Sequence, residues 1–164
     1  MSNENDMMDN ADNTSGRTTS LGETASVVLT IPCAPEYVGT ARLTILGVAS
    51  RMGFSYDQVE DIRLAVGEAC ANAIERASSL KVANPLITIR SLVEPSKLTV
   101  EVEDHTDAPA GEGIDTEKPA AEIESMNSQE LGALLMEILV DEVSVETTAG
   151  GGTRVRLVKF ANES

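Results

Sequence analysis

Apolar residues recur at helical spacing in three segments of this sequence and predict three helices. Two of these helices have a sharply defined start, because Ser55 with Gln58 and Asn127 with Glu130 have the spacing of a capping box. The helices are expected over about 35–52, from Ser55 to about Ser79, and from Asn127 to about Asp141. The second contains a continuous helix-forming run, DIRLAVGEACANAIERA, around which we expect the rest of the chain to be organised.

Short runs of alternating or β-branched residues predict five strands. They are expected at Ser26–Ile31, Leu86–Leu92, Leu98–Val102, Val143–Thr147 and Arg154–Phe160. The second and third strands flank a turn at Glu94-Pro95-Ser96, and the last two flank the glycines at 150–152. The order of strand, two helices, two strands, helix and two strands indicates an α+β sandwich, with helices on one face of a mostly antiparallel sheet.

Two stretches have no sustained periodicity. Residues 1–24 are rich in Asn, Asp, Ser, Thr and Gly and predict a disordered acidic tail, because such a segment cannot bury enough apolar surface to order itself. Residues 104–129 form a long segment that suggests either a functional lid or a disordered insert, and eight acids against one Lys fall between Asp104 and Glu130. A single domain is expected over 25–162.

Charge and cysteine content exclude several classes of function. The formal net charge of -15 over 164 residues argues against binding to a nucleic-acid backbone and favours basic protein surfaces as partners. No apolar run reaches membrane-spanning length and the N-terminus lacks a secretory signal, so we expect a cytoplasmic protein. With Cys33 and Cys70 as the only cysteines and a single His, neither a disulfide nor a zinc site is favoured.

Glu68 and Asn72 are the candidate chemical pair within the second helix. A spacing of four residues projects a carboxylate and an amide from one helical face, at the border of its apolar stripe. Taken alone, the pair is more typical of a polar surface beside an Ala-rich core than of a chemical site. An Asn oxygen is nevertheless a suitable Mg²⁺ ligand, since magnesium prefers oxygen and keeps water and phosphates in its coordination shell.

The surrounding run AVGEACANA resembles the N box of the GHKL ATPases, in which a Glu polarises the attacking hydroxyl and an Asn holds the magnesium of ATP. The longer segments PEYVGTARLTILGVASRMGFSYDQVEDIRLAVGEACANAI and LLMEILVDEV are similar to bacterial anti-sigma-factor serine kinases, especially the anti-sigma-B (RsbW-type) branch. The similarity extends from about Val27 to Phe160 and implies the Bergerat fold, a two-layer sandwich with a mixed, mostly antiparallel sheet. It also implies that 104–129 is an ATP lid.

The resemblance assigns roles to matching residues. Glu68 would be the catalytic residue, Asn72 the ligand of Mg²⁺, and Asp104 the acceptor for the adenine amino group of ATP. Gly132 and Thr153 match the later glycine and Gly-Thr motifs near the nucleotide. Arg76 stands where the family has His or Lys, and either meets phosphate or is a solvated surface residue.

Two positions depart from the family pattern. Thr106 replaces the glycine of the Asp-x-Gly motif, and Glu130 replaces the first glycine of the Gly-x-Gly motif before the third helix. A Glu there would fill space and repel phosphate, whereas glycine lets backbone N–H groups approach it. The sequence therefore suggests an intact catalytic half of the site and an eroded phosphate-binding half.

Arg42 matches an arginine that the family uses to contact both the sigma factor and its antagonist. The resemblance thus implies an anti-sigma factor that sequesters an alternative, general-stress sigma factor and phosphorylates a serine of a STAS-type anti-anti-sigma factor, acting as a homodimer. A non-catalytic anti-sigma binding module with a degenerate nucleotide site is the alternative, motivated by Thr106 and Glu130. A histidine-kinase fragment is disfavoured, because no region with a phospho-acceptor His precedes the domain.

Overall fold

The computed structural model describes residues 24–105 and 124–162. The expected tail at 1–24 and the expected lid at 104–129 therefore fall largely outside the described residues, as does Thr106. Within the described ranges, no helix is long and apolar enough to cross a membrane.

Five strands form one sheet in the order β1-β2-β3-β5-β4, and all four pairings between neighbouring strands are antiparallel. The strands are β1 (Ala25–Pro32), β2 (Leu86–Glu94), β3 (Lys97–Asp104), β4 (Glu142–Thr147) and β5 (Thr153–Phe160). The expected α+β sandwich is confirmed, but the sheet of the described chain is antiparallel throughout rather than mixed. Two successive helices bring the chain back to the end of the sheet where β1 stopped, so β2 runs antiparallel to β1.

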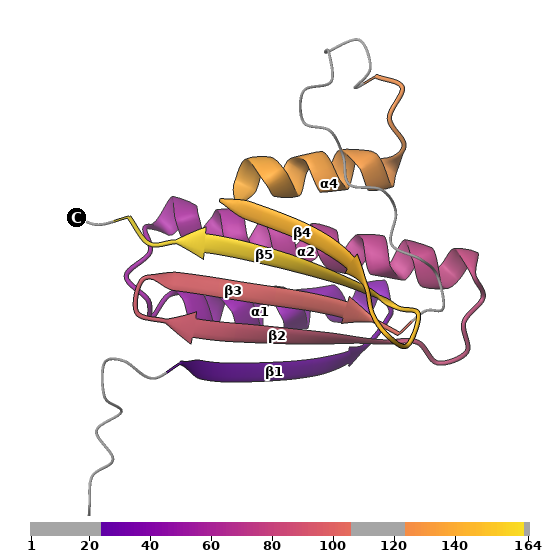
Figure 1. Cartoon of the computed structure of the whole chain (residues 1–164), viewed down its shortest axis with the longest axis horizontal. Coiled ribbons are helices and arrows are strands. Elements are labelled where there is room, and N and C mark those ends of the chain that lie inside the picture. The colour runs from indigo at the N-terminus through magenta and orange to yellow at the C-terminus, as the bar shows by residue number, and fades with distance from the viewer. Residues whose placement is uncertain (1–23, 106–123, 163–164) are drawn as a thin grey trace, which may run out of the picture.

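The helices cover one face of this sheet, and among the described residues no helix covers its other face, as Figure 1 shows. They comprise a 3-10 turn η1 (Pro35–Tyr37) leading into α1 (Val38–Ala49), then α2 (Tyr56–Ser79) and α4 (Ser128–Leu139). Both predicted capping boxes are present, at the starts of α2 and α4. The first helix ends three residues earlier than expected, in a turn that leads to Gly53 with a φ of 73°.

The core lies between the helices and the inward-facing residues of β2 and β3. Ile87 and Ile89 on β2 and Val100 on β3 are at most 1% exposed. They pack in one cluster with the buried face of α2, where Ala65, Ala69 and Ala73 allow close approach because their side chains are small. An Ala-rich α2 thus occupies the centre of the sandwich, and the polar residues at its border lie close to neighbouring elements.

Candidate nucleotide and phosphoryl-transfer site

Glu68 and Asn72 project from α2 toward the same point, the first turns of α4. A Cβ atom added to Gly132 of α4 would lie 3.1 Å from Asn72 Oδ1 and 3.1 Å from Glu68 Oε2. Asn72 is 7% exposed and Glu68 is partly buried. The structure therefore places the carboxylate and the amide side by side against a position that lacks a side chain.

A second group of candidate residues, Arg76, Asp104 and Thr153, comes from α2, β3 and β5. Arg76 donates from Nε at 3.1 Å and from Nη2 at 2.5 Å to the same oxygen, Asp104 Oδ2. The other oxygen, Asp104 Oδ1, accepts from the backbone N–H of Thr153 at 3.1 Å. Arg76 is thus part of a buried ion pair, and the interpretation of Arg76 as a solvated surface residue is wrong.

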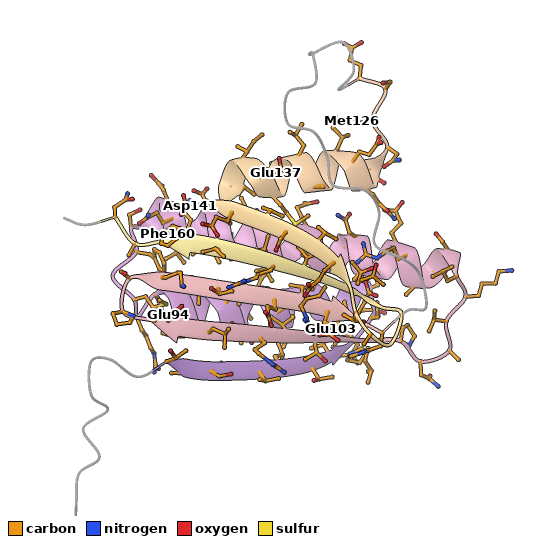
Figure 2. The ribbon with its side chains drawn as sticks, in the orientation of Figure 1. Glu94, Glu103, Met126, Glu137, Asp141 and Phe160 are labelled. Carbon is orange, nitrogen blue, oxygen red and sulfur yellow. The ribbon has the colours of Figure 1, made fainter. Side chains whose placement is uncertain are left out.

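These residues meet at one end of the sheet. Figure 2 shows Glu103, next to Asp104, and Met126, just before α4, toward the same end of the molecule, whereas Asp141 and Phe160 lie toward the opposite end. Antiparallel pairing brings the end of β3 beside the start of β5. The helix α2 contributes both Asn72 and Arg76, which lie one turn apart and therefore on the same side of the helix.

Gly152 has a structural role that the amino-acid sequence alone does not reveal. The glycine run was interpreted as a hairpin turn, and Gly151 with a φ of 88° fits that interpretation. A Cβ atom on Gly152, however, would approach the carbonyl carbon of Asp104 to 3.1 Å and its oxygen more closely still. The missing side chain thus lets β5 start directly against Asp104, so that the next N–H, that of Thr153, can bind the carboxylate.

Glu130 is engaged at the start of α4. Its Oε2 accepts from the backbone N–H of Asn127 at 3.0 Å, and Asn127 Oδ1 accepts from the N–H of Glu130 at 2.9 Å. Its carboxylate is therefore bound at the helix end, as the predicted capping box requires. Its negative charge remains at this helix N-terminus.

Arg42 on α1 packs against α2. A Cβ atom on Gly67 would lie 2.8 Å from Arg42 Cζ, so the guanidinium rests on the helix backbone one residue before Glu68. Within the described residues, the buried Nε of Arg42 has no hydrogen-bond partner. The role in partner binding that the resemblance implies for Arg42 stays a prediction, and the structure shows that Gly67 provides the space in which its guanidinium lies.

Both cysteines are free, as expected. Burial raises the pKa of the Cys70 thiol to about 12. Burial and the nearby Asp104 carboxylate raise the pKa of Cys33, while Arg76 acts in the opposite direction. Both thiols therefore remain protonated at neutral pH.

The donor set fits a nucleotide with magnesium. The buried Thr153 Oγ1 lacks a hydrogen-bond partner among the described residues, and both the oxygen and the nitrogen of the Asn72 amide lie beside the glycine of α4. In the described part of the chain, no three His, Cys, Asp or Glu side chains are grouped to hold a metal. This pattern suits a cation that one amide binds together with phosphate oxygens, because Mg²⁺ commonly takes few protein ligands.

Comparisons with known proteins show the family of this chain. The model of the histidine kinase-like ATPase domain family matches residues 31–159. The serine-protein kinase RsbW of Bacillus subtilis is 37% identical over 140 residues, covering 83% of this chain and 86% of the relative. The RsbW of Listeria monocytogenes is 35% identical over 146 residues, covering 84% and 88%.

Two solved structures share the fold. The RsbU and RsbW domains of a Mycobacterium tuberculosis protein match with a TM-score of 0.61 at 17% identity, over 85% of this chain and 33% of theirs. The SiaB-SiaC complex of Pseudomonas aeruginosa matches with a TM-score of 0.58 at 11% identity, over 80% of this chain and 88% of the matched one. From the family model and the relatives, the chain belongs to the histidine kinase-like ATPase domain family and, within it, to the RsbW serine-protein kinases.

Proposed function

We propose that this protein is an anti-sigma factor with serine-kinase activity, which sequesters a general-stress sigma factor and phosphorylates a serine of a STAS-type anti-anti-sigma factor in the cytoplasm. The observation that carries the proposal is the convergence of Glu68 and Asn72 on Gly132, in a chain that belongs to the RsbW kinases. Phosphorylation would stop the antagonist from displacing the sigma factor.

Each residue of the proposed site has a physical task. Bound ATP with Mg²⁺ supplies the phosphoryl group, and Asn72 is the proposed protein ligand of the metal. Glu68 orients the serine hydroxyl of the antagonist and accepts its proton. Asp104 is the proposed acceptor for the adenine amino group, and Gly132 and Thr153 are the proposed residues whose backbone and hydroxyl groups approach the nucleotide; the contacts of Gly132 with Glu68 and Asn72 and of Thr153 with Asp104 support this.

The kinase activity is tested by incubating the protein with labelled ATP and its cognate antagonist. Wild type should transfer the label to a serine, and Glu68→Gln should slow transfer by at least about 100-fold, the usual contribution of a positioned general base. Glu60→Gln makes the same chemical change two turns earlier in α2, in a partly exposed pair with Arg63, and should retain activity. Absence of transfer by wild type, with sigma-factor binding intact, would leave only the non-catalytic binding module.

Nucleotide binding is tested separately by thermal unfolding with and without ATP and Mg²⁺. A ligand stabilises the folded state that it binds, so saturating nucleotide should raise Tm of the wild type. Asn72→Ala should abolish the part of this rise that depends on magnesium. An equal rise in the variant would remove Asn72 from the proposed metal site.

The proposed partner surface includes Arg42 and is expected to act within a homodimer. Gly67→Ala offers a test that leaves Arg42 in the sequence, because the added methyl group would occupy the place of its guanidinium. Since the guanidinium ends a flexible side chain, the fold should persist while Arg42 moves. Weaker sigma-factor binding by both Gly67→Ala and Arg42→Ala would support a partner surface that includes Arg42, and unchanged binding by both would exclude it. Light scattering tests separately whether the protein is a homodimer.

A further inference from the structure

We propose that Arg76 limits recognition of the nucleotide base, because it holds the Asp104 carboxylate in an ion pair that the amino group of adenine must displace. The inference rests on the proposed function, in which Asp104 faces the base. It makes Arg76 a specificity-determining residue of this chain, at a position for which the sequence suggested contact with phosphate.

The geometry leaves little of the carboxylate available. Asp104 is 1% exposed and the Arg76 side chain is 16% exposed. Two guanidinium N–H groups, on Nε and Nη2, converge on Oδ2 at 3.1 and 2.5 Å, and the Thr153 N–H occupies Oδ1 at 3.1 Å. Each oxygen of the carboxylate therefore already accepts a hydrogen bond.

A charged donor and a neutral donor compete unequally for this oxygen. Both donors make a charge-assisted hydrogen bond to the carboxylate, but only the guanidinium carries a positive charge and donates two N–H groups to the same oxygen, Asp104 Oδ2. Displacing Arg76 would also separate a buried ion pair, which leaves charge without compensation. The amino group consequently contributes little to binding as long as Arg76 remains in place.

The position of Arg76 links the covered carboxylate to the rest of the proposed site. It lies one helical turn from Asn72 on α2, so the helix that carries the proposed metal ligand also carries the group that covers the base acceptor. On the other side, Gly152 lies against the Asp104 backbone, and the N–H of the next residue, Thr153, binds the carboxylate. The carboxylate cannot turn away from Arg76 without losing the Thr153 hydrogen bond.

The test compares ATP with purine riboside triphosphate, which lacks the 6-amino group, in the presence of Mg²⁺. Calorimetry gives Kd for wild type, Arg76→Gln and the control Arg63→Gln, which removes a more exposed arginine pair from the same helix. In wild type and the control, the two nucleotides should differ by less than about threefold. In Arg76→Gln, ATP should bind about tenfold more tightly and the analogue should bind as before, as expected when a neutral donor replaces a charged competitor.

Three results would overturn the inference. Wild type that prefers ATP to the analogue by about tenfold already uses the amino group fully. Equal weakening of both nucleotides in Arg76→Gln would mean that Arg76 serves the phosphates. An unchanged ratio of the two Kd values in Arg76→Gln would mean that Arg76 does not compete with the amino group. A different failure is that neither nucleotide binds to any of the folded proteins, which would refute the proposed nucleotide site itself. Should Arg76→Gln fail to fold, the same two Kd values are measured for Arg76→Lys, and the ratio of the two Kd values in wild type decides whether the amino group contributes to binding.

Discussion

Gly132 offers a perturbation that separates the stability of the fold from the proposed chemistry. In Gly132→Ala, the new methyl group would lie 3.1 Å from Glu68 Oε2 and from Asn72 Oδ1, and 3.2 Å from Asn72 Nδ2. These contacts are a few tenths of an ångström too close, so both side chains must shift. Moving a side chain off its preferred rotamer costs on the order of 0.5–1.5 kcal/mol.

The helix gains at the same time. Gly132 lies inside α4, where alanine is more favourable than glycine by about 0.8–1.0 kcal/mol. The two effects oppose each other and are of similar size, so the free energy of unfolding should change by no more than about 1 kcal/mol. For a chain of this length, that corresponds to a shift in Tm of about 2–4 °C.

Phosphoryl transfer should respond much more strongly. Displacements of reacting groups cost large factors, about 100-fold for roughly 1 Å, so a shift of a few tenths of an ångström should slow transfer about three- to six-fold. The assay follows label transfer to the antagonist in single-turnover conditions, beside thermal unfolding of the same sample. Because both displaced side chains are in the proposed site, affinity for ATP with Mg²⁺ should also fall.

Gly47→Ala is the matched control. Gly47 lies in α1, and a Cβ atom there meets nothing within 4 Å, so the variant should gain stability without losing affinity for nucleotide. Full transfer activity in Gly132→Ala, at unchanged stability, would refute the view that Glu68 and Asn72 act as a pair at this point. A large loss of stability would instead refute the estimate that crowding and helix propensity balance.

Three further predictions concern stability and charge. Gly152→Ala should destabilise the fold by several times the typical cost of a point mutation, about 1 kcal/mol, because its Cβ atom collides with the Asp104 backbone, and thermal unfolding measures this loss. Glu130→Gln keeps a residue suited to the capping box but removes a negative charge, so affinity for ATP should rise at low salt, whereas Glu124→Gln outside the helix should have no effect. Because burial raises the pKa of Cys70 from 9.0 to about 12, the unfolded chain loses this proton first; stability should fall by about 1.4 kcal/mol per pH unit above pH 9, and Cys70→Ala should flatten that slope in urea unfolding.

Most of the fold could be predicted from the sequence because its signals are local. The capping boxes at Ser55 and Asn127 define helix starts by the spacing of two side chains, and both are present. The strands likewise follow from alternating residues and short turns. The purely antiparallel sheet was missed, because strand direction depends on how two helices return the chain, which is a property of the connection rather than of any strand.

The site was predictable only where its residues share one helix. Glu68 and Asn72 lie on one face of α2, and helical geometry alone brings them together. The bond between Arg76 and Asp104 joins residues 28 positions apart in different elements, so no local rule contains it. The approach of Gly152 to Asp104 is likewise a tertiary contact, although an additional glycine in a turn that needs only one was a signal that could have suggested it.

The two unusual side chains of this site, Arg76 and Glu130, share a physical logic. Each already satisfies a group that a nucleotide would otherwise satisfy: Arg76 neutralises the carboxylate proposed to face the base, and Glu130 places a negative charge at the helix N-terminus proposed to face phosphate. Both contacts stabilise the protein without ligand. On the proposed function, a nucleotide would have to replace these contacts rather than fill an unsatisfied site, so the stability that they provide would lower its affinity, while the proposed catalytic pair Glu68 and Asn72 would stay in place.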